Sequence, residues 1–570
     1  MNFKKNIPPF VLVTALTVLY VAELYWVYTV NFAACEDAYI TFRFAENLAK
    51  GLGPVFNPGE AVEGYSNFLW MVFLSASYRL GFDMETVSRL AGAVLNTLAV
   101  FLVWYIPRRH FSVRGTSAFL GPLLYLLFLP FHFYATSGLE TTLYLFCILL
   151  CTHTVLWAGA RPFPFVLAAF SLLITALVRP EGILLCVFLC AYLLWRCVFR
   201  SGPWKPYLPG ILLFAIGYGA FLLWRIDYYG LPFPNTYYAK GSFPFFIRAA
   251  LGFIMNKGFI THYAYLPLFL LAVLGFVKTP EGYPRDIVLL FLCTGLLFSL
   301  AFSGFDWMPF FRYTLPVVPL LIILCQTCFF CLWQKISTGG ALRQKLIWSA
   351  ITAVFILAAA EQFLYDASFT LQWNKVNRYA MYNQKTMGLW MKEALGSEPL
   401  IAVGDVGRLA YFSHATVMDI FGLTNRDIAL LRKHYGSPEI ILPGCTISFD
   451  HYKEKERELL LEMKPDYIFF YNAHLKITDA FPGSADGIVE HPDFLEQYDY
   501  MDSFSVVPRF TSPYWPKLHY CIEVLDLSAG LLTWMRDGWG YDIYRRKDSP
   551  FKRFTIHRLP DGRIKNIVAG

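Results

Sequence analysis

Two adjacent carboxylates, Glu36 and Asp37, lie near the start of the stretch CEDAYITFRFAENLAKG, which follows the first long apolar run of the chain. An ionised carboxylate beside hydrocarbon is costly, so this pair requires either water and polar partners or a chemical role. A positioned carboxylate is a suitable general base, because it can accept the proton of a substrate hydroxyl. Glu36 and Asp37 are therefore candidate catalytic residues, with Asp37 preferred as the base.

The residues after this acidic pair predict the element that positions it. Apolar residues recur there at helical spacing, namely Ala38, Phe42, Ala45 and Leu48. This spacing predicts a short amphipathic helix lying at the membrane surface. The two acids then stand at the helix N-terminus, where the helix dipole favours an ionised carboxylate. An N-cap is the competing interpretation, because Asp is a preferred N-cap residue.

Further polar residues occur in short motifs between apolar runs. The candidates for substrate binding are Glu140 in SGLETT, Arg179 and Glu181 in LVRPEG, Asn235, Tyr238 and Lys240 in PNTYYAK, and Asp306 and Arg312 in SGFDWMPFFR. Cations gathered at one membrane face suggest an anionic ligand, and we expect Arg179, Lys240 and Arg312 to bind a phosphate group. Anchorage of the basic side chains at the membrane interface is the alternative.

Glu140 has no obvious local partner in the sequence. An acid of this kind within a membrane usually has a functional or long-range structural partner. The alternative is that SGLETT is a helix start capped by Ser137 or Thr141.

The composition is that of a polytopic α-helical membrane protein. The 570 residues are 56% hydrophobic and 16% charged, which exceeds what the core of a soluble domain requires. The formal charge of +7 is spread over short clusters, which disfavours nucleic acid as a partner. Runs of spanning length predict about eleven helices, near residues 10–30, 88–106, 117–134, 141–160, 164–178, 183–198, 208–224, 262–277, 286–303, 313–333 and 346–364.

Positive charge sets the predicted orientation. If the short apolar stretch 67–82 does not span, three basic loops share a side with the N-terminal lysines, namely 108–114, 196–205 and 335–345. That side is cytoplasmic by the positive-inside rule. A long first loop, 31–87, and the polar motifs then lie on the external face of the cytoplasmic membrane, with 67–82 as a juxtamembrane element.

Two units follow from the distribution of apolar runs. Residues 1–364 are predicted to form the transmembrane core, and residues 365–570 an external α/β domain. Strand-like pieces IAVGD, ATVMDIFG and KPDYIFF alternate there with helical or turn-rich stretches. Cys445 and Cys521 of this domain either pair or remain thiols.

The sequence requires no cofactor. It contains no glycine-rich loop of the kind that cradles a nucleotide phosphate. Cys325, Cys328 and Cys331 are embedded in an apolar run, which argues against a zinc site. Whether a divalent metal takes part stays open.

The motifs as an ordered set resemble those of GT-C glycosyltransferases that take a sugar from a polyprenyl-phosphate carrier. The resemblance is strongest to the mycobacterial terminal β-(1→2)-arabinofuranosyltransferases and their bacterial relatives, and it extends to about residue 430. It rests on EDAYITFRFAENLAKGLGPVFNPGEAVEGYSNFLW, SGLETTLY, LVRPEG, YYGLPFPNTYYAK, GFDWMPFFRYTLPVVP and GDVGRLAYFSHATVMDIFGLTNRDIA. That family usually has two aspartates where this chain has Glu36 and Asp37, which leaves open which acid does the chemistry.

The resemblance implies a membrane-embedded catalytic core in which a first-loop acid acts on the acceptor hydroxyl at the external face. Its implied partners are a polyprenyl-phosphate sugar donor, the bilayer, and a glycan, lipid or protein acceptor of the cell envelope. We therefore expect a glycosyltransferase, and the resemblance favours a pentofuranose such as arabinofuranose as the sugar. The alternative is a polytopic transporter or flippase for a lipid-linked saccharide, because intramembrane charges also mark translocation paths.

Overall fold

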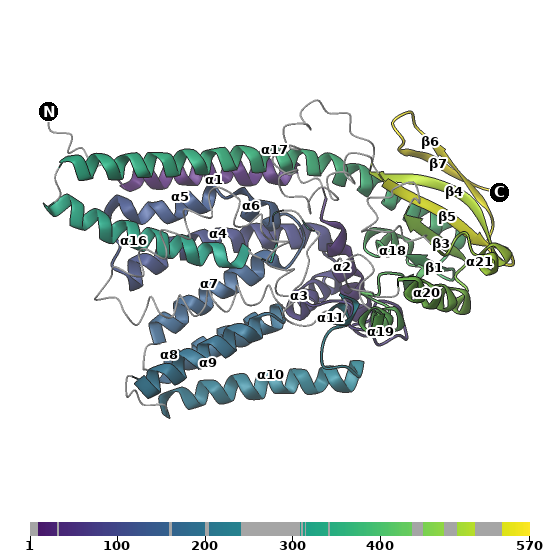
Figure 1. Cartoon of the computed structure of the whole chain (residues 1–570), viewed down its shortest axis with the longest axis horizontal. Coiled ribbons are helices and arrows are strands. Elements are labelled where there is room, and N and C mark those ends of the chain that lie inside the picture. The colour runs from purple at the N-terminus through teal and green to yellow at the C-terminus, as the bar shows by residue number, and fades with distance from the viewer. Residues whose placement is uncertain are drawn as a thin grey trace.

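A helical bundle and a smaller unit built around a β-sheet make up the structure, which is a computed structural model (Figure 1). It describes residues 9–30, 33–158, 162–199, 205–240, 308, 310, 312–313, 315–339, 342–435, 449–471, 487–507 and 539–570. One apolar core runs through both units and includes Tyr39, Met387 and Val403, each no more than 1% exposed. The two units therefore pack as one body.

Long apolar helices form the bundle. The described residues contain four helices that are long and apolar enough to cross a membrane, within α1 (Pro9–Val30), α4 (Met84–His110), α7 (Thr141–Ala158) and α10 (Leu208–Tyr229). The pair Gly115–Leu126 and Leu129–Ala135, which contains α5 (Leu120–Leu126) and α6 (Leu129–Ala135), is bent by 61° and makes a fifth candidate. Three other helices of the bundle are α8 (Pro162–Val178), α9 (Gly182–Phe199) and α16 (Val318–Gly339).

A polytopic helical membrane protein is thus confirmed. The count of about eleven spans stays a prediction, because the runs 262–277 and 286–303 lie outside the described residues.

Three short helices lie where the bundle meets the second unit: α2 (Glu36–Ala49), α3 (Phe68–Arg79) and α11 (Asn235–Ala239). That 67–82 does not span stays a prediction, which the length of α3 supports, because its 12 residues extend only about 18 Å against a hydrocarbon core of about 30 Å.

The predicted amphipathic helix is present as α2, and its position at the membrane surface stays a prediction. Most of its polar side chains are buried, including Arg43 and Glu46 at 6% exposure. The second unit covers the polar face, and the Arg43 guanidinium donates hydrogen bonds to the carbonyls of Ala410 and Ala415 at 2.8 and 2.7 Å.

The second unit contains a five-stranded mixed sheet in the order β2-β1-β3-β5-β4. The strands are β1 (Leu400–Val403), β2 (Thr416–Asp419), β3 (Tyr467–Tyr471), β4 (Tyr498–Val507) and β5 (Trp539–Arg546). The predicted strand pieces correspond to β1, β2 and β3, which pair in parallel. The sequence did not indicate β5, which pairs antiparallel with β3, or β4, which pairs antiparallel with β5.

Helices α18 (Arg408–Ser413), α19 (Arg426–Tyr435), α20 (Phe449–Met463) and α21 (Pro492–Gln497) accompany this sheet, and β6 (Phe554–Arg558) and β7 (Ile564–Ala569) form a separate hairpin.

The 54-residue helix α17 (Leu342–Leu395) runs along the bundle and into the second unit (Figure 1). It packs on α18 and β4 as well as on α1. The predicted boundary between residues 364 and 365 falls inside this helix, so it stays a prediction of where the lipid-facing part ends.

The carboxyl ends of β1 and β2 face the bundle. The loop after β1 reaches α2, where the amide of Gly407 donates to the Glu36 carboxylate. The loop after β2 reaches α11, where Asn235 Nδ2 donates to the carbonyl of Gly422 at 2.7 Å. In open α/β sheets this edge is the usual place for a binding site, and here it is the edge that meets the bundle.

Candidate active site at the end of the bundle

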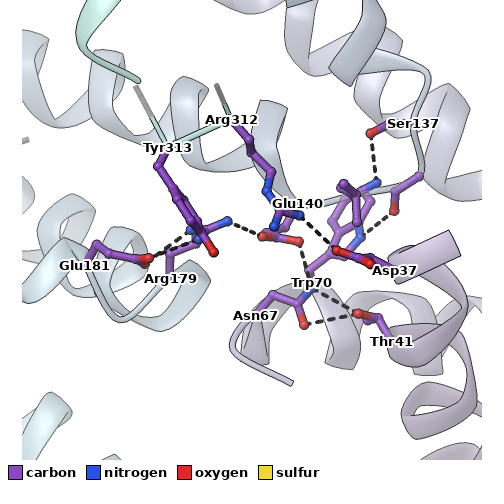
Figure 2. Close-up of polar contacts among 12 residues, drawn as sticks. Asp37, Thr41, Asn67, Trp70, Ser137, Glu140, Arg179, Glu181, Arg312 and Tyr313 are labelled. Carbon is purple, nitrogen blue, oxygen red and sulfur yellow. Dashed lines mark hydrogen bonds and ion pairs between the residues drawn. The ribbon is translucent and has the colours of Figure 1, made fainter. Parts of the chain in front are cut away.

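A buried ion cluster links three of the predicted residues. Arg179 Nη1 lies 2.6 Å from Glu140 Oε1, and Arg179 Nη2 lies 3.0 Å from Glu181 Oε1 (Figure 2). The side chains of Arg179 and Glu140 are 6% and 5% exposed. The expectation that Glu140 has a long-range partner is therefore met by Arg179, 39 positions away.

Local sequence explains how these residues meet. Glu140 directly precedes α7, and its carbonyl accepts the first helical bond from the amide of Tyr144. Arg179 and Glu181 flank Pro180 in the turn between α8 and α9, because proline disfavours helical backbone in the residue before it and ends α8 there.

The same cluster continues to the helix that carries the acidic pair. Asn67 Nδ2 donates to Glu140 Oε2 at 2.8 Å and approaches Thr41 Oγ1 at 3.1 Å (Figure 2). Thr41 lies one turn after Asp37 on α2, so the two side chains share a face. Asn67 thus connects α2, which carries Glu36 and Asp37, to the buried ion cluster.

Asp37 lies on the solvent side of this arrangement. Its side chain is 41% exposed, and Oδ2 lies 3.4 Å from Arg312 Nη1 (Figure 2). The N-cap residue of α2 is Cys35, and its side chain makes no capping bond. Asp37 therefore does not cap α2, which removes the competing interpretation of this residue.

Glu36 is in the opposite environment. Its Oε1 accepts hydrogen bonds from the amides of Gly407 at 2.5 Å and Arg408 at 3.3 Å. Burial raises the pKa of Glu36 well above its usual range, and repulsion by Asp405 and Asp37 adds to this increase. The Arg408 guanidinium opposes it. Glu36 therefore holds α2 against the loop after β1.

Three predicted cations surround one aromatic ring. The charged groups of Arg179, Lys240 and Arg312 lie 5.2, 5.0 and 5.3 Å from the ring centroid of Tyr313. Lys240 Nζ also donates to Tyr313 Oη at 2.6 Å. Such distances fit cation–π attraction, which is strongest away from water. The three cations that we expected to bind phosphate therefore all lie next to the ring of Tyr313.

The turn between α8 and α9 keeps its acid ionised. Burial alone would raise the pKa of Glu181. The charge of Arg179 and the hydrogen bonds from its guanidinium have the larger combined effect and lower this pKa to about 2. The carboxylates of Asp37, Glu140 and Glu181 thus face the cations of Arg179, Lys240 and Arg312, so the site balances three negative charges against three positive ones.

Two predicted binding residues do not join this cluster. Asn235 Nδ2 donates to the carbonyls of Gly422, Leu423 and Asn425, which attaches α11 to the loop after β2. The ring of Tyr238 lies 4.5 Å from Lys433 Nζ of α19. These contacts of the two side chains are with the second unit. Asp306, Cys445 and Cys521 lie outside the described residues.

Sequence reasoning missed Thr41, Asn67, Tyr313 and Gly407. All four lie inside motifs that had been singled out, but their types suggested neither charge nor nucleophilicity. Within the described ranges, no group of three His, Cys, Asp or Glu side chains is placed to hold a metal ion. The question of a metal stays open.

Two curated proteins are similar to part of this chain. The terminal β-(1→2)-arabinofuranosyltransferase of Mycobacterium tuberculosis is 32% identical over 229 residues, covering 36% of this chain and 35% of the relative. The protein of the same name from Corynebacterium glutamicum is 31% identical over 241 residues, covering 36% and 33%. The chain thus matches about a third of the length of each relative. Residues 372–522 match a domain of unknown function, DUF8728.

Solved structures show the fold. ArnT from Cupriavidus metallidurans in the apo state superposes with a TM-score of 0.52 at 16% identity, covering 75% of this chain and 92% of that one. The Archaeoglobus fulgidus oligosaccharyltransferase in the apo form gives 0.51 at 10% identity, covering 92% and 88%. The predicted resemblance is confirmed: the chain is distantly homologous to the arabinofuranosyltransferases and has the fold of ArnT and the oligosaccharyltransferase.

Proposed function

We propose that this protein is a glycosyltransferase that moves a sugar from a polyprenyl phosphate to an acceptor hydroxyl at the external face of the membrane. The observation that carries this proposal is the arrangement around Asp37. A partly exposed carboxylate at a helix N-terminus lies beside Arg312, and Arg312 shares the ring of Tyr313 with Lys240 and Arg179. A base and an anion-binding site therefore adjoin each other.

The chemistry follows from these positions. Asp37 accepts the proton of the acceptor hydroxyl as its oxygen attacks the anomeric carbon of the sugar. The bond between that carbon and the phosphate oxygen breaks, and its electron pair leaves with the polyprenyl phosphate. Cations placed where this negative charge develops lower the barrier, because they need no reorganisation during the reaction.

The three cations have different parts in this proposal. Arg179 is bound by two carboxylates, so its role is to orient the cluster rather than to supply net positive charge. Lys240 and Arg312 are the residues that we assign to the departing phosphate. Glu36 is a positioning residue, because its carboxylate is occupied by the backbone amides of the loop after β1.

The relatives support the choice of substrate class. The names of the curated relatives specify arabinofuranosyl transfer, so we propose a pentofuranose as the sugar. One ArnT structure with a TM-score of 0.50 contains undecaprenyl phosphate, which makes a polyprenyl phosphate the carrier to test first. The acceptor is a hydroxyl-bearing component of the cell envelope. We place the site on the external side because the basic loops at the opposite ends of the helices are expected in the cytoplasm.

The experiment is a donor panel with purified protein. Undecaprenyl phosphates that carry arabinofuranose or other sugars are incubated with the protein and an envelope glycan extract, and free undecaprenyl phosphate is quantified. We expect release with at least one donor, and Asp37→Asn serves as the inactive control. Translocation of the donor across proteoliposomes without any release would instead support the transporter.

A further inference from the structure

We propose that the hydroxyls of Thr141 and Tyr144 bind the head group of the polyprenyl-phosphate donor, so that the first turn of α7 forms one wall of the donor site. This inference rests on the proposed function and adds two binding residues that carry no charge.

Both hydroxyls are buried, and neither has a partner in the part of the chain that the structure describes. Thr141 and Tyr144 are 2% and 3% exposed, and neither side-chain oxygen has a hydrogen-bond partner among the described residues. A buried hydroxyl without a partner is costly, and nearly all such groups in proteins are bonded. Two of them within one helical turn call for a partner that arrives with a ligand.

The segment that precedes α7 explains why the Thr141 hydroxyl does not donate to a carbonyl of its own helix. A threonine in a helix commonly donates to the carbonyl four residues earlier, as Thr152 does to Ile148 at 2.8 Å on the same helix. For Thr141 the residue four positions earlier is Ser137, which precedes the first residue of α7 and is not helical. The helical geometry that brings such a carbonyl to the threonine hydroxyl is therefore missing at Thr141.

The location of the two residues points to the donor. They are three positions apart and lie on one face of α7, in its first turn, where unbonded amides and the helix dipole favour an anion. The guanidinium carbon of Arg179 lies 5.7 Å from the ring of Tyr144 and 5.2 Å from the ring of Tyr313. Tyr144 therefore borders the cluster in which Lys240 and Arg312 also lie.

The test measures stability and affinity together in Tyr144→Phe and Thr141→Val. Removal of a hydroxyl that has no protein partner should leave the melting temperature of the ligand-free protein unchanged or higher. The affinity for the donor should fall by about three- to tenfold, as for loss of one hydrogen bond. The probes are undecaprenyl phosphate and undecaprenyl-phosphate arabinofuranose. A loss with both probes assigns the phosphate as partner, and a loss with the second probe alone assigns the sugar.

Tyr125→Phe is the matched control. Its buried hydroxyl donates to Asn96 Oδ1 at 2.7 Å inside the bundle, so this variant should melt at a lower temperature and keep its affinity. Unchanged affinity in both test variants would overturn the inference. So would a stability loss like that of Tyr125→Phe, because it would place the missing partner within the protein. If the wild-type protein binds neither probe, the proposed function itself fails.

Discussion

The carboxylates of Glu36 and Asp37 lie in opposite environments although the two residues are adjacent in the chain. The Glu36 carboxylate accepts two backbone amides from the loop after β1, whereas the Asp37 side chain is 41% exposed beside Arg312. A group that must exchange a proton with a substrate needs access to it. This difference supports Asp37 as the base and gives Glu36 a structural role.

Replacement of Asp37 tests the base directly. Asp37→Asn keeps the shape of the side chain and removes its ability to accept a proton. We expect a fall in transfer rate of about a hundredfold or more, which is typical of losing a positioned base. The melting temperature should stay within a few degrees of the wild type, because Asn has nearly the same size as Asp and is itself favoured at a helix N-terminus. A transfer rate near that of the wild type would mean that the base lies elsewhere.

The buried carboxyl of Glu36 predicts a dependence of stability on pH. Its folded pKa is raised above the ordinary value of 4.5, so the folded protein binds more protons than the unfolded chain at pH values above about 4.5. The free energy of unfolding should therefore fall as pH rises above about 4.5 towards the raised folded pKa, by at most about 1.4 kcal/mol per pH unit.

Glu36→Gln removes this titrating group and should flatten that fall in chemical unfolding curves. The exposed Glu398 provides the control, since Glu398→Gln should leave the pH dependence as it is. If Glu36→Gln and the wild type lose stability in parallel, the Glu36 carboxyl is ionised in the folded protein.

The contact between Glu36 and Gly407 has no room for a side chain. A Cβ atom added to Gly407 would clash with both the backbone carbonyl and the carboxylate of Glu36. Gly407→Ala should therefore push α2 away from the loop after β1, at a cost of about 1 to 3 kcal/mol in stability, and lower the transfer rate with it. Gly396→Ala is a control in which an added Cβ meets no atom within 4 Å. Its φ of 74° is strained for alanine and accounts for an expected cost of about 1 to 2 kcal/mol, with no effect on the transfer rate.

The sequence predicted features that depend on local pattern. Apolar runs of spanning length, the short helix around 67–82 and the three parallel strands follow from hydropathy and residue type over a few neighbouring positions. The grouping of Glu140, Arg179 and Glu181 was also within reach, because buried charges require partners.

Features that depend on long-range packing were not predictable from local pattern. Arg43 is buried because it donates to carbonyls more than 360 positions away. The amphipathic pattern of α2 does not indicate that these carbonyls cover its polar face. Asn235 and Tyr238 have polar types that fit a binding site equally well, yet their contacts attach α11 to the second unit. The role of Tyr313 arises from three cations brought together by separate segments.

The orientation in the membrane can be tested with two exposed positions. Thr116 lies after a basic loop that we expect in the cytoplasm, and Ser397 lies between α17 and β1 on the side that we expect to be external. In intact cells a membrane-impermeant maleimide should label Ser397→Cys, while Thr116→Cys should react only after permeabilisation. The wild-type protein with its native cysteines sets the background. The reverse labelling pattern would invert the proposed orientation.

The last prediction separates the cluster that orients the site from the residues that bind phosphate. Arg179 neutralises two largely buried carboxylates, so Arg179→Gln leaves Glu140 and Glu181 without their cation. We expect this variant to lose about 3 to 5 kcal/mol of stability. Lys240→Gln and Arg312→Gln should instead keep the fold and bind undecaprenyl phosphate roughly ten- to a hundredfold more weakly, as expected for loss of one charge-assisted bond.

A double variant distinguishes orientation from direct binding by Arg179. If Arg179 mainly balances the two acids, adding Glu140→Gln to Arg179→Gln should recover part of the lost stability, and a double-mutant cycle measures the coupling between them. The same double variant should then retain measurable affinity for undecaprenyl phosphate through Lys240 and Arg312. Stable folding of Arg179→Gln with complete loss of phosphate binding would make Arg179 the principal phosphate ligand, and Lys240 and Arg312 would then be interfacial anchors.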